Sequence, residues 1–87
     1  MTMPPNQWFR KAADQGDAAG QFSLGVMYDN GSGVVKDEVK AYKWYLLSRA
    51  QGNDSAKKRI EIMERVLTPA QRAEAQKIAR EWKPRKP

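Results

Sequence analysis

The 87-residue chain contains no cysteine and no histidine. Their absence excludes disulfide frameworks, thiol nucleophiles, metal sites built on cysteine or histidine, and the side chain whose unperturbed pKa lies nearest neutrality. It does not identify the redox compartment, because a chain without disulfides is compatible with reducing and oxidising surroundings. Most enzyme mechanisms are difficult to write with the residue types that remain. We therefore expect no enzyme activity, no cofactor and no metal.

Long hydrophobic runs are also missing. No segment approaches the roughly 20 apolar residues that span a bilayer, and residues 1–7 have neither the positive charge nor the apolar stretch of a signal peptide. These absences predict a soluble chain without membrane association and favour the cytoplasm, while the compartment itself stays unknown. A chain of this length buries only about 60–65 % of its unfolded surface, so we expect a thin core and a functional site on the surface.

Basic residues outnumber acidic ones by 16 to 10, which gives a net charge of +6. The excess belongs to the C-terminal part, because residues 1–52 hold six basic and five acidic side chains, whereas residues 53–87 hold ten and five. This imbalance makes nucleic-acid binding the alternative function. Against it, the basic residues near the C-terminus alternate with Glu74 and Glu81, a pattern typical of a solvated helix face. Nucleic acid is therefore an unfavoured partner.

Two dipeptides recur at a constant offset. Trp8-Phe9 returns as Trp44-Tyr45, and Gln15-Gly16 returns as Gln51-Gly52, 36 positions later in both cases. A period in the mid-thirties is the length of a two-helix solenoid unit. Apolar stripes with helical spacing, and no useful stripe with strand spacing, predict an all-α fold. The expected helices cover residues 5–15, 18–30, 38–51, 53–67 and 68–82.

Several residues mark the ends of these helices. Asp17 and Asp37 are expected N-caps, and Thr68, followed by proline at the first and glutamine at the third helical position, predicts a capping box. Gly16 and Gly52 suit the left-handed position that follows a helix.

Gly25 lies inside a predicted helix, where glycine costs about 1 kcal/mol relative to alanine. A close helix crossing is the usual compensation, and we expect Ala41 to be the small partner on the next helix. The flanks of this crossing would be filled by Tyr28, Trp44 and Tyr45. On the last helix, the spacing predicts that Ala75, Ile78, Ala79 and Trp82 face inward and that Arg72, Lys77, Arg80 and Glu81 face outward.

An ordered string of residues resembles the Sel1-like repeat family, a tetratricopeptide-like solenoid. The string comprises Leu24-Gly25, Tyr28, Asn30-Gly31-Ser32-Gly33-Val34, Lys36-Asp37, Lys40-Ala41, Trp44-Tyr45 and Gln51-Gly52-Asn53. The resemblance implies a short right-handed α-solenoid of about five helices. It also implies a scaffold or adaptor role, in which a concave surface holds a peptide or another protein.

The resemblance divides the chain into one repeat with incomplete ends. We expect a single domain over residues 1–82, followed by a disordered basic tail over residues 83–87. Within the domain, the expected units are a half repeat at 5–16, a full repeat at 17–52, a half repeat at 53–67 and a C-terminal capping helix at 68–82.

A partner-binding groove is the first candidate site. Phe22, Val26 and Asp29 lie about opposite the core-facing side of the second helix. Their repeat equivalents, 36 positions on, are Lys58, Ile62 and Arg65. The competing interpretation is that these six residues pack against neighbouring helices or simply face water. As a groove, they would combine apolar and basic groups suited to an acidic peptide.

A self-association edge is the second candidate. Trp8, Phe9 and Ala12 lie on a helix that lacks the partner helix of a complete preceding repeat, and solenoids need about three repeats to be stable. This edge could be covered in three ways: by a second copy of the chain in a homodimer, by further repeats of a longer array, or by the N-terminal segment folded over it.

Overall fold

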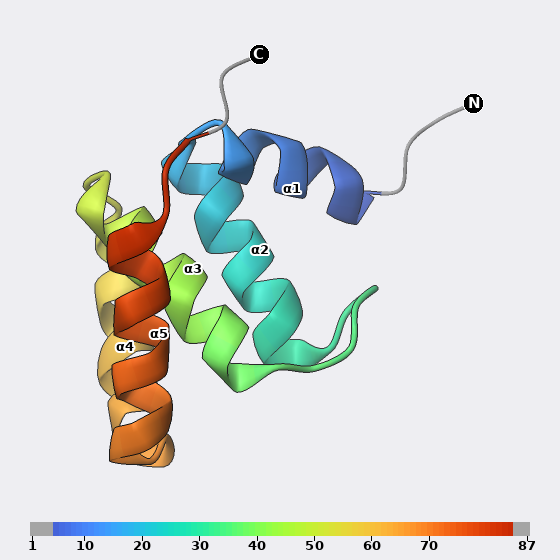
Figure 1. The fold of residues 1–87 in the computed structure, drawn as a ribbon. Helices are drawn as coiled ribbons and strands as arrows, with labels where there is room; N and C mark the ends of the chain where they lie inside the picture. The colour runs from blue at the N-terminus through green and yellow to red at the C-terminus, as the bar shows by residue number, and fades with distance from the viewer. Residues whose placement is uncertain (1–4, 85–87) are drawn as a thin grey trace.

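A computed structural model of the chain describes residues 5–84. Within that range the chain is all-α, with five helices and no strand, as predicted (Figure 1). The helices are α1 (Pro5–Asp14), α2 (Ala18–Asn30), α3 (Glu38–Ala50), α4 (Asp54–Val66) and α5 (Pro69–Glu81). Each expected helix is present, and its ends lie within one residue of the predicted ones.

The predicted caps hold the helix ends. The Asp17 carboxylate accepts a hydrogen bond from the Gly20 amide at 2.7 Å, and Asp37 accepts one from Lys40 at 3.0 Å. Thr68 forms the expected capping box with the side chain and amide of Gln71. Because a helix start leaves amide groups without partners, these side chains fix where each helix begins. Gly16 and Gly52 have φ values of 94° and 96°, the left-handed conformation expected of them.

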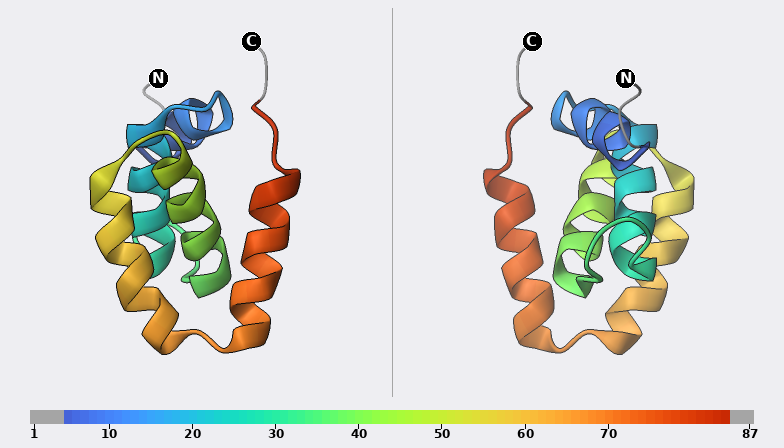
Figure 2. Two further views of the ribbon diagram at one scale, coloured as in Figure 1. Left: turned by 90° about the vertical axis from the view of Figure 1, so that its left-hand side faces the viewer. Right: turned by 90° about the vertical axis from the view of Figure 1, so that its right-hand side faces the viewer.

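Helix α3 is the centre of the arrangement. It packs against α2, α4 and α5, whereas α1 packs against α2. Helices α4 and α5 diverge from their junction, and α3 lies between the two arms (Figure 2). The side chains of α3 are consequently buried around most of the helix, and they include Ala41, Tyr42, Trp44, Tyr45, Leu47 and Ser48. The solenoid core is therefore built around one helix.

The crossing of α2 and α3 differs in detail from the prediction. A Cβ atom at Gly25 would lie 2.7 Å from two ring atoms of Tyr45 and 3.3 Å from the Ala41 carbonyl oxygen. The close partner of Gly25 is therefore the Tyr45 ring, and not the small side chain of Ala41. Tyr45 is fully buried, so this aromatic ring needs the space that a side chain at position 25 would occupy.

The inward stripe of α4 is formed by Ala56, Ile60, Met63 and Leu67, which recur at three or four positions and are all buried. Two predictions for α5 are wrong. Ile78 remains 39 % exposed, and Arg72 is half-buried with its Nε shielded from water. Among the described helices, α5 makes substantial contact with α3 alone, so its buried face is narrower than its apolar stripe.

The space between α4 and α5 is filled from α3. The Tyr42 hydroxyl donates a hydrogen bond to the Glu64 carboxylate of α4 at 3.2 Å. Burial raises the pKa of Tyr42, and the negative charge of Glu64 raises it further, while Gln76 and Arg72 of α5 oppose the shift. Arg72 thus lies near this hydroxyl group, which accounts for its partial burial.

The chain beyond α5 crosses back toward α1. Trp82 packs edge-on against Trp44, with ring centroids 6.2 Å apart. Pro84 lies beside Gly16, since a Cβ atom added at Gly16 would be 3.8 Å from the Pro84 ring. The tail predicted over residues 83–87 is thus described only at Lys83 and Pro84, which are exposed, and its remainder lies outside the described residues.

Candidate functional site

The three groove candidates on α2 are all half-buried. Phe22 packs against Tyr45 with ring centroids 5.7 Å apart, and Val26 packs against the edge of the core. The Asp29 carboxylate accepts a hydrogen bond from the Tyr45 hydroxyl at 3.2 Å. This side of α2 therefore both supports α3 and leaves part of its surface in water.

The hydroxyl group of Tyr45 is held in its protonated form. Burial raises the pKa of Tyr45, and the neighbouring Asp29 charge and hydrogen bond raise it further, while Arg59 of α4 acts in the opposite direction. The phenol consequently stays neutral and remains a hydrogen-bond donor across the physiological pH range. The charge of Arg59 on α4 thus acts on a hydroxyl group of α3.

The three candidates on α4, Lys58, Ile62 and Arg65, are all exposed. Ile62 is 55 % exposed, and Val66, one turn further on, is 64 % exposed. We define the α4 outer face as the exposed residues within about one-sixth of a turn around the helix from Ile62, namely Ser55, Lys58, Arg59, Ile62, Arg65 and Val66, and the exposed carboxylates Asp54 and Glu61 lie at its border. The 36-residue offset identified only three of them. Helical spacing from Ile62 leads to the others, because they lie three, four or seven positions away.

A shallow hollow is lined by residues of both α2 and α4. It has a volume of about 350 Å³ and is lined by Phe22, Asp54, Ser55, Lys58 and Arg59. Two of the six groove candidates, Phe22 and Lys58, are thus brought together, whereas Val26, Asp29, Ile62 and Arg65 do not line it. The hollow combines an aromatic ring, two cations and one carboxylate, so it presents apolar and charged groups side by side.

The three residues of the candidate self-association edge on α1 differ in their exposure to water. Trp8 is 56 % exposed and Phe9 is 39 % exposed. Ala12 is half-buried and close to α2, since a Cβ atom at Gly20 would lie 2.8 Å from the Ala12 methyl group. Ala12 therefore belongs to the contact between α1 and α2, and the uncovered part of this edge is formed by Trp8 and Phe9.

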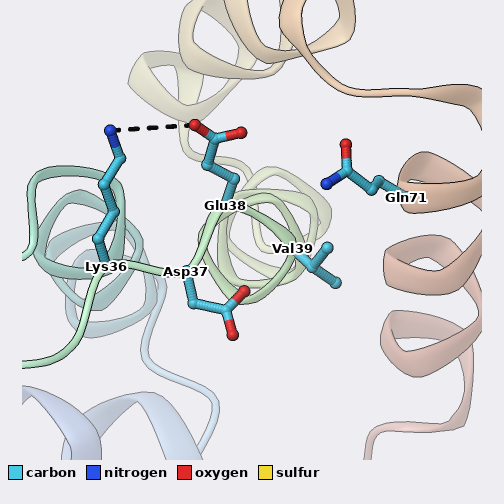
Figure 3. Close-up of a pocket in the computed structure, with 5 residues that line it drawn as sticks. All are labelled: Lys36, Asp37, Glu38, Val39 and Gln71. Atoms are coloured by element: carbon cyan, nitrogen blue, oxygen red, sulfur yellow. Dashed lines mark ion pairs between the residues drawn. The ribbon is translucent and has the colours of Figure 1, made fainter.

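Another hollow, of about 420 Å³, lies between the starts of α3 and α5 (Figure 3). Its polar side chains already have local partners: Lys36 pairs with Glu38 at 3.9 Å, Asp37 caps α3, and Gln71 takes part in the capping box. A further hollow of about 300 Å³, between α3 and α5, is lined mainly by aliphatic groups, including Leu46, Leu47 and Ala79. The polar groups that line the hollow between the starts of α3 and α5 thus stabilise the ends of these two helices.

Lys43 is the one lysine of α3 with a strongly shifted pKa. Its ammonium group lies 3.9 Å above the Trp44 ring, and burial together with the nearby charge of Arg10 lowers its pKa to about 8, although Asp14 opposes the shift. A cation held over an indole face is attracted by the ring electrons. We interpret Lys43 as a cover for Trp44 at the contact with α1.

Two kinds of feature are not found in residues 5–84. No helix there combines the length and apolar character needed to cross a membrane. Nor does this part of the chain gather three or more acidic side chains in an arrangement that could hold a metal ion.

The comparisons with known proteins agree on one family. The profile of the Sel1 repeat matches residues 6–17 and 18–53, which together are more than half of the chain. The chain is 43 % identical over 54 residues to chitin synthase regulatory factor 3 of Schizosaccharomyces pombe, which covers 62 % of this chain and 6 % of that protein. It is also 37 % identical over 57 residues to DAP3-binding cell death enhancer 1 of Rattus norvegicus, covering 66 % of this chain and 11 % of the relative.

A third relative is chitin synthase regulator SKT5 of Saccharomyces cerevisiae, 40 % identical over 48 residues, which cover 55 % of this chain and 7 % of that protein. The chain therefore corresponds to only a small part of each of these curated relatives. The first match, residues 6–17, coincides with α1, and the second, residues 18–53, contains the α2 and α3 hairpin. The chain belongs to the Sel1 repeat family.

Proposed function

We propose that this chain is a non-catalytic protein–protein interaction module that acts as a scaffold or adaptor. The partner, a peptide or a folded protein, binds where α2 and α4 present Phe22, Val26, Asp29, Lys58, Ile62 and Arg65. The observation that carries the proposal is the exposure of Ile62 and Val66 beside three cations on the α4 outer face. Sel1 repeats and the regulatory and binding proteins similar to this chain support a role in protein interaction.

The chemistry of the surface also favours binding over catalysis. Asp29 is engaged by Tyr45, Asp37 caps a helix and Glu64 is engaged by Tyr42, so these carboxylates have structural partners. Covering the exposed aliphatic groups with a partner, by contrast, lowers the free energy by about 25 cal/mol per Å² of apolar area removed from water. The mixture of aliphatic and basic groups suits a partner of acidic character.

A photo-crosslinking amino acid placed at Ile62 or at Lys58 tests the proposal. We expect both positions to capture the same protein, and the same substitution at Lys77 on α5 to capture none of it. With that protein purified, Lys58→Glu combined with Arg65→Glu should weaken binding about tenfold or more, because two attractions become repulsions. Unchanged affinity of the double variant, or equal capture at Lys77, would remove α2 and α4 from the site.

Self-association at α1 is a second candidate, favoured by one comparison within the molecule. Trp8 and Phe9 are 56 % and 39 % exposed, whereas their repeat equivalents Trp44 and Tyr45 are 3 % and 0 % exposed. A homodimer formed through the α1 edge would bury Trp8 and Phe9, as the core already buries their repeat equivalents.

We further propose that residues 5–16 and 53–67 are half repeats, residues 17–52 are the full repeat and residues 68–82 are a capping helix.

Light scattering across protein concentration tests the homodimer. We expect a mass that rises toward twice that of the chain, and we expect Trp8→Glu to keep the chain monomeric, because a charge would then be buried in the interface. Lys77→Glu, on a different helix, is the matched control and should leave the mass unchanged. A strict monomer at every concentration would contradict self-association.

A further inference from the structure

We propose that the α4 outer face binds an acidic amphipathic helix of the partner protein, which packs along α4 as in a short coiled coil. This inference rests on the proposed function and names the chemistry of the partner.

The spacing of the exposed residues is the first argument. Ser55, Arg59, Ile62 and Val66 follow one another at intervals of four, three and four residues, and all four are exposed. This alternation is the spacing of the positions that form the seam between two coiled-coil helices. One flank of this seam, at Ala56 and Met63, is buried in the core, so a second helix can approach the seam from the other flank, where Lys58 and Arg65 are exposed.

The placement of charge is the second argument. Lys58 and Arg65 lie seven positions apart and each directly precedes a seam residue, which is a flanking position where coiled coils place the ion pairs that select a partner. Arg59 adds a cation within the seam. Of the carboxylates of α4, Glu64 is engaged by Tyr42, whereas Asp54 lines the hollow beside Lys58 and Arg59 and Glu61 is exposed one turn from Lys58 and from Arg65, so the three cations exceed the carboxylates on this side of α4 by one. A complementary helix therefore carries aliphatic residues along its seam and carboxylates on its flank.

The hollow beside Phe22 fixes where the partner helix ends. It lies at the N-terminal part of α4, beside Ser55, Lys58 and Arg59, and its volume of about 350 Å³ accommodates one large side chain. An aromatic or long aliphatic residue of the partner would contact the Phe22 ring there. A carboxylate next to it would meet Lys58 and Arg59. The hollow and the seam thus form one continuous surface along α4.

A second copy of the chain is a poor occupant of this surface. In a symmetric contact through this face, Lys58, Arg59 and Arg65 of one copy would meet the same three cations of the other copy and repel them. Helix α5 interleaves Glu74 and Glu81 with Lys77 and Arg80 and therefore offers no continuous acidic flank. Charge complementarity points to a different protein, and the acidic helix is the chemistry that the α4 outer face selects.

Two synthetic peptides, each about three heptads long, test the inference. One carries leucine along its seam and glutamate at both flanking positions, and its neutral twin carries glutamine in place of glutamate. Fluorescence anisotropy of each labelled peptide, titrated with the full chain at about 150 mM salt, gives the affinity. We expect the acidic peptide to bind about tenfold or more tightly than its neutral twin.

Variants of the chain locate the binding. Lys58→Glu combined with Arg65→Glu, and separately Ile62→Ser, should each weaken binding of the acidic peptide about tenfold. Lys57→Glu combined with Lys77→Glu makes the same change of charge away from the α4 outer face and should leave the affinity within about twofold. Circular dichroism of each variant verifies that it is folded.

Three results would overturn the inference. They are no binding of the acidic peptide, equal weakening by the Lys57 and Lys77 control, and displacement of the peptide by an RNA or DNA oligonucleotide at the same salt, which would assign the face to nucleic acid. A partner that crosslinks at Ile62 while both peptides fail to bind would leave the proposed function standing and reject the acidic helix. Failure of the crosslinking experiment with normal peptide binding would reject the proposed function alone.

Discussion

Tyr45→Ala is expected to lower the free energy of unfolding by about 3–5 kcal/mol, the range measured for truncating a large buried aromatic residue. Tyr45 is fully buried, packs against Gly25 and Phe22, and donates a hydrogen bond to Asp29. Alanine would leave a cavity at the meeting point of α2 and α3. Because domains of this size are stable by only about 5–10 kcal/mol, the loss consumes a large part of the total.

Tyr45→Phe is the matched control, because it keeps the ring and removes the hydroxyl group. It should cost only about 1 kcal/mol, the net value of a hydrogen bond. Urea unfolding followed by circular dichroism gives both free energies from the same measurement. Equal losses in the two variants would contradict the packing explanation and would place the stabilisation in the hydrogen bond to Asp29.

Gly25→Ala is expected to destabilise the chain by about 1–3 kcal/mol, although alanine favours helices by about 1 kcal/mol over glycine. The new methyl group would lie 2.7 Å from the Tyr45 ring, and because that ring is fully buried it must shift against the core to make room. Thermal unfolding of the variant measures the loss. Ser23→Ala, two positions earlier on α2, is the control and should leave the stability nearly unchanged.

A double variant isolates the contact itself. With Tyr45→Leu already present, Gly25→Ala should cost less than it does alone, because the ring atoms that oppose the methyl group are gone. Residues in contact show such non-additive free energies, whereas distant residues do not. Additive losses would show that the cost of Gly25→Ala arises elsewhere in α2.

The sequence predicted the helices well because their ends depend on neighbouring residues. An N-cap side chain at Asp17 or Thr68 bonds to an amide three positions away, so its effect is visible in the local sequence. The internal repeat predicted a two-helix solenoid unit, because the offset of 36 residues is the length of such a unit, and the ordered string from Leu24 to Asn53 predicted the family.

The candidate site was predicted less completely. The offset of 36 residues identified Lys58, Ile62 and Arg65 but missed Arg59 and Val66, because their equivalents on α2, Ser23 and Asn30, are not apolar or basic. The offset also did not predict that Phe22 packs against the Tyr45 ring or that Asp29 accepts a hydrogen bond from the Tyr45 hydroxyl group. These contacts join residues that are more than a dozen positions apart, and no local spacing encodes them.

For this protein, the sequence by itself determined five helices, their caps, the repeat unit and the absence of cysteine and histidine chemistry, because each depends on residue types and short-range spacing. Tertiary structure alone decided that α4 and α5 diverge around α3, that Tyr45 packs into the space at Gly25, and that Ile78 remains exposed. Which face of a helix stays in water depends on what packs against it. The partner surface that we propose is therefore the part of α2 and α4 that the packing of α3 leaves uncovered.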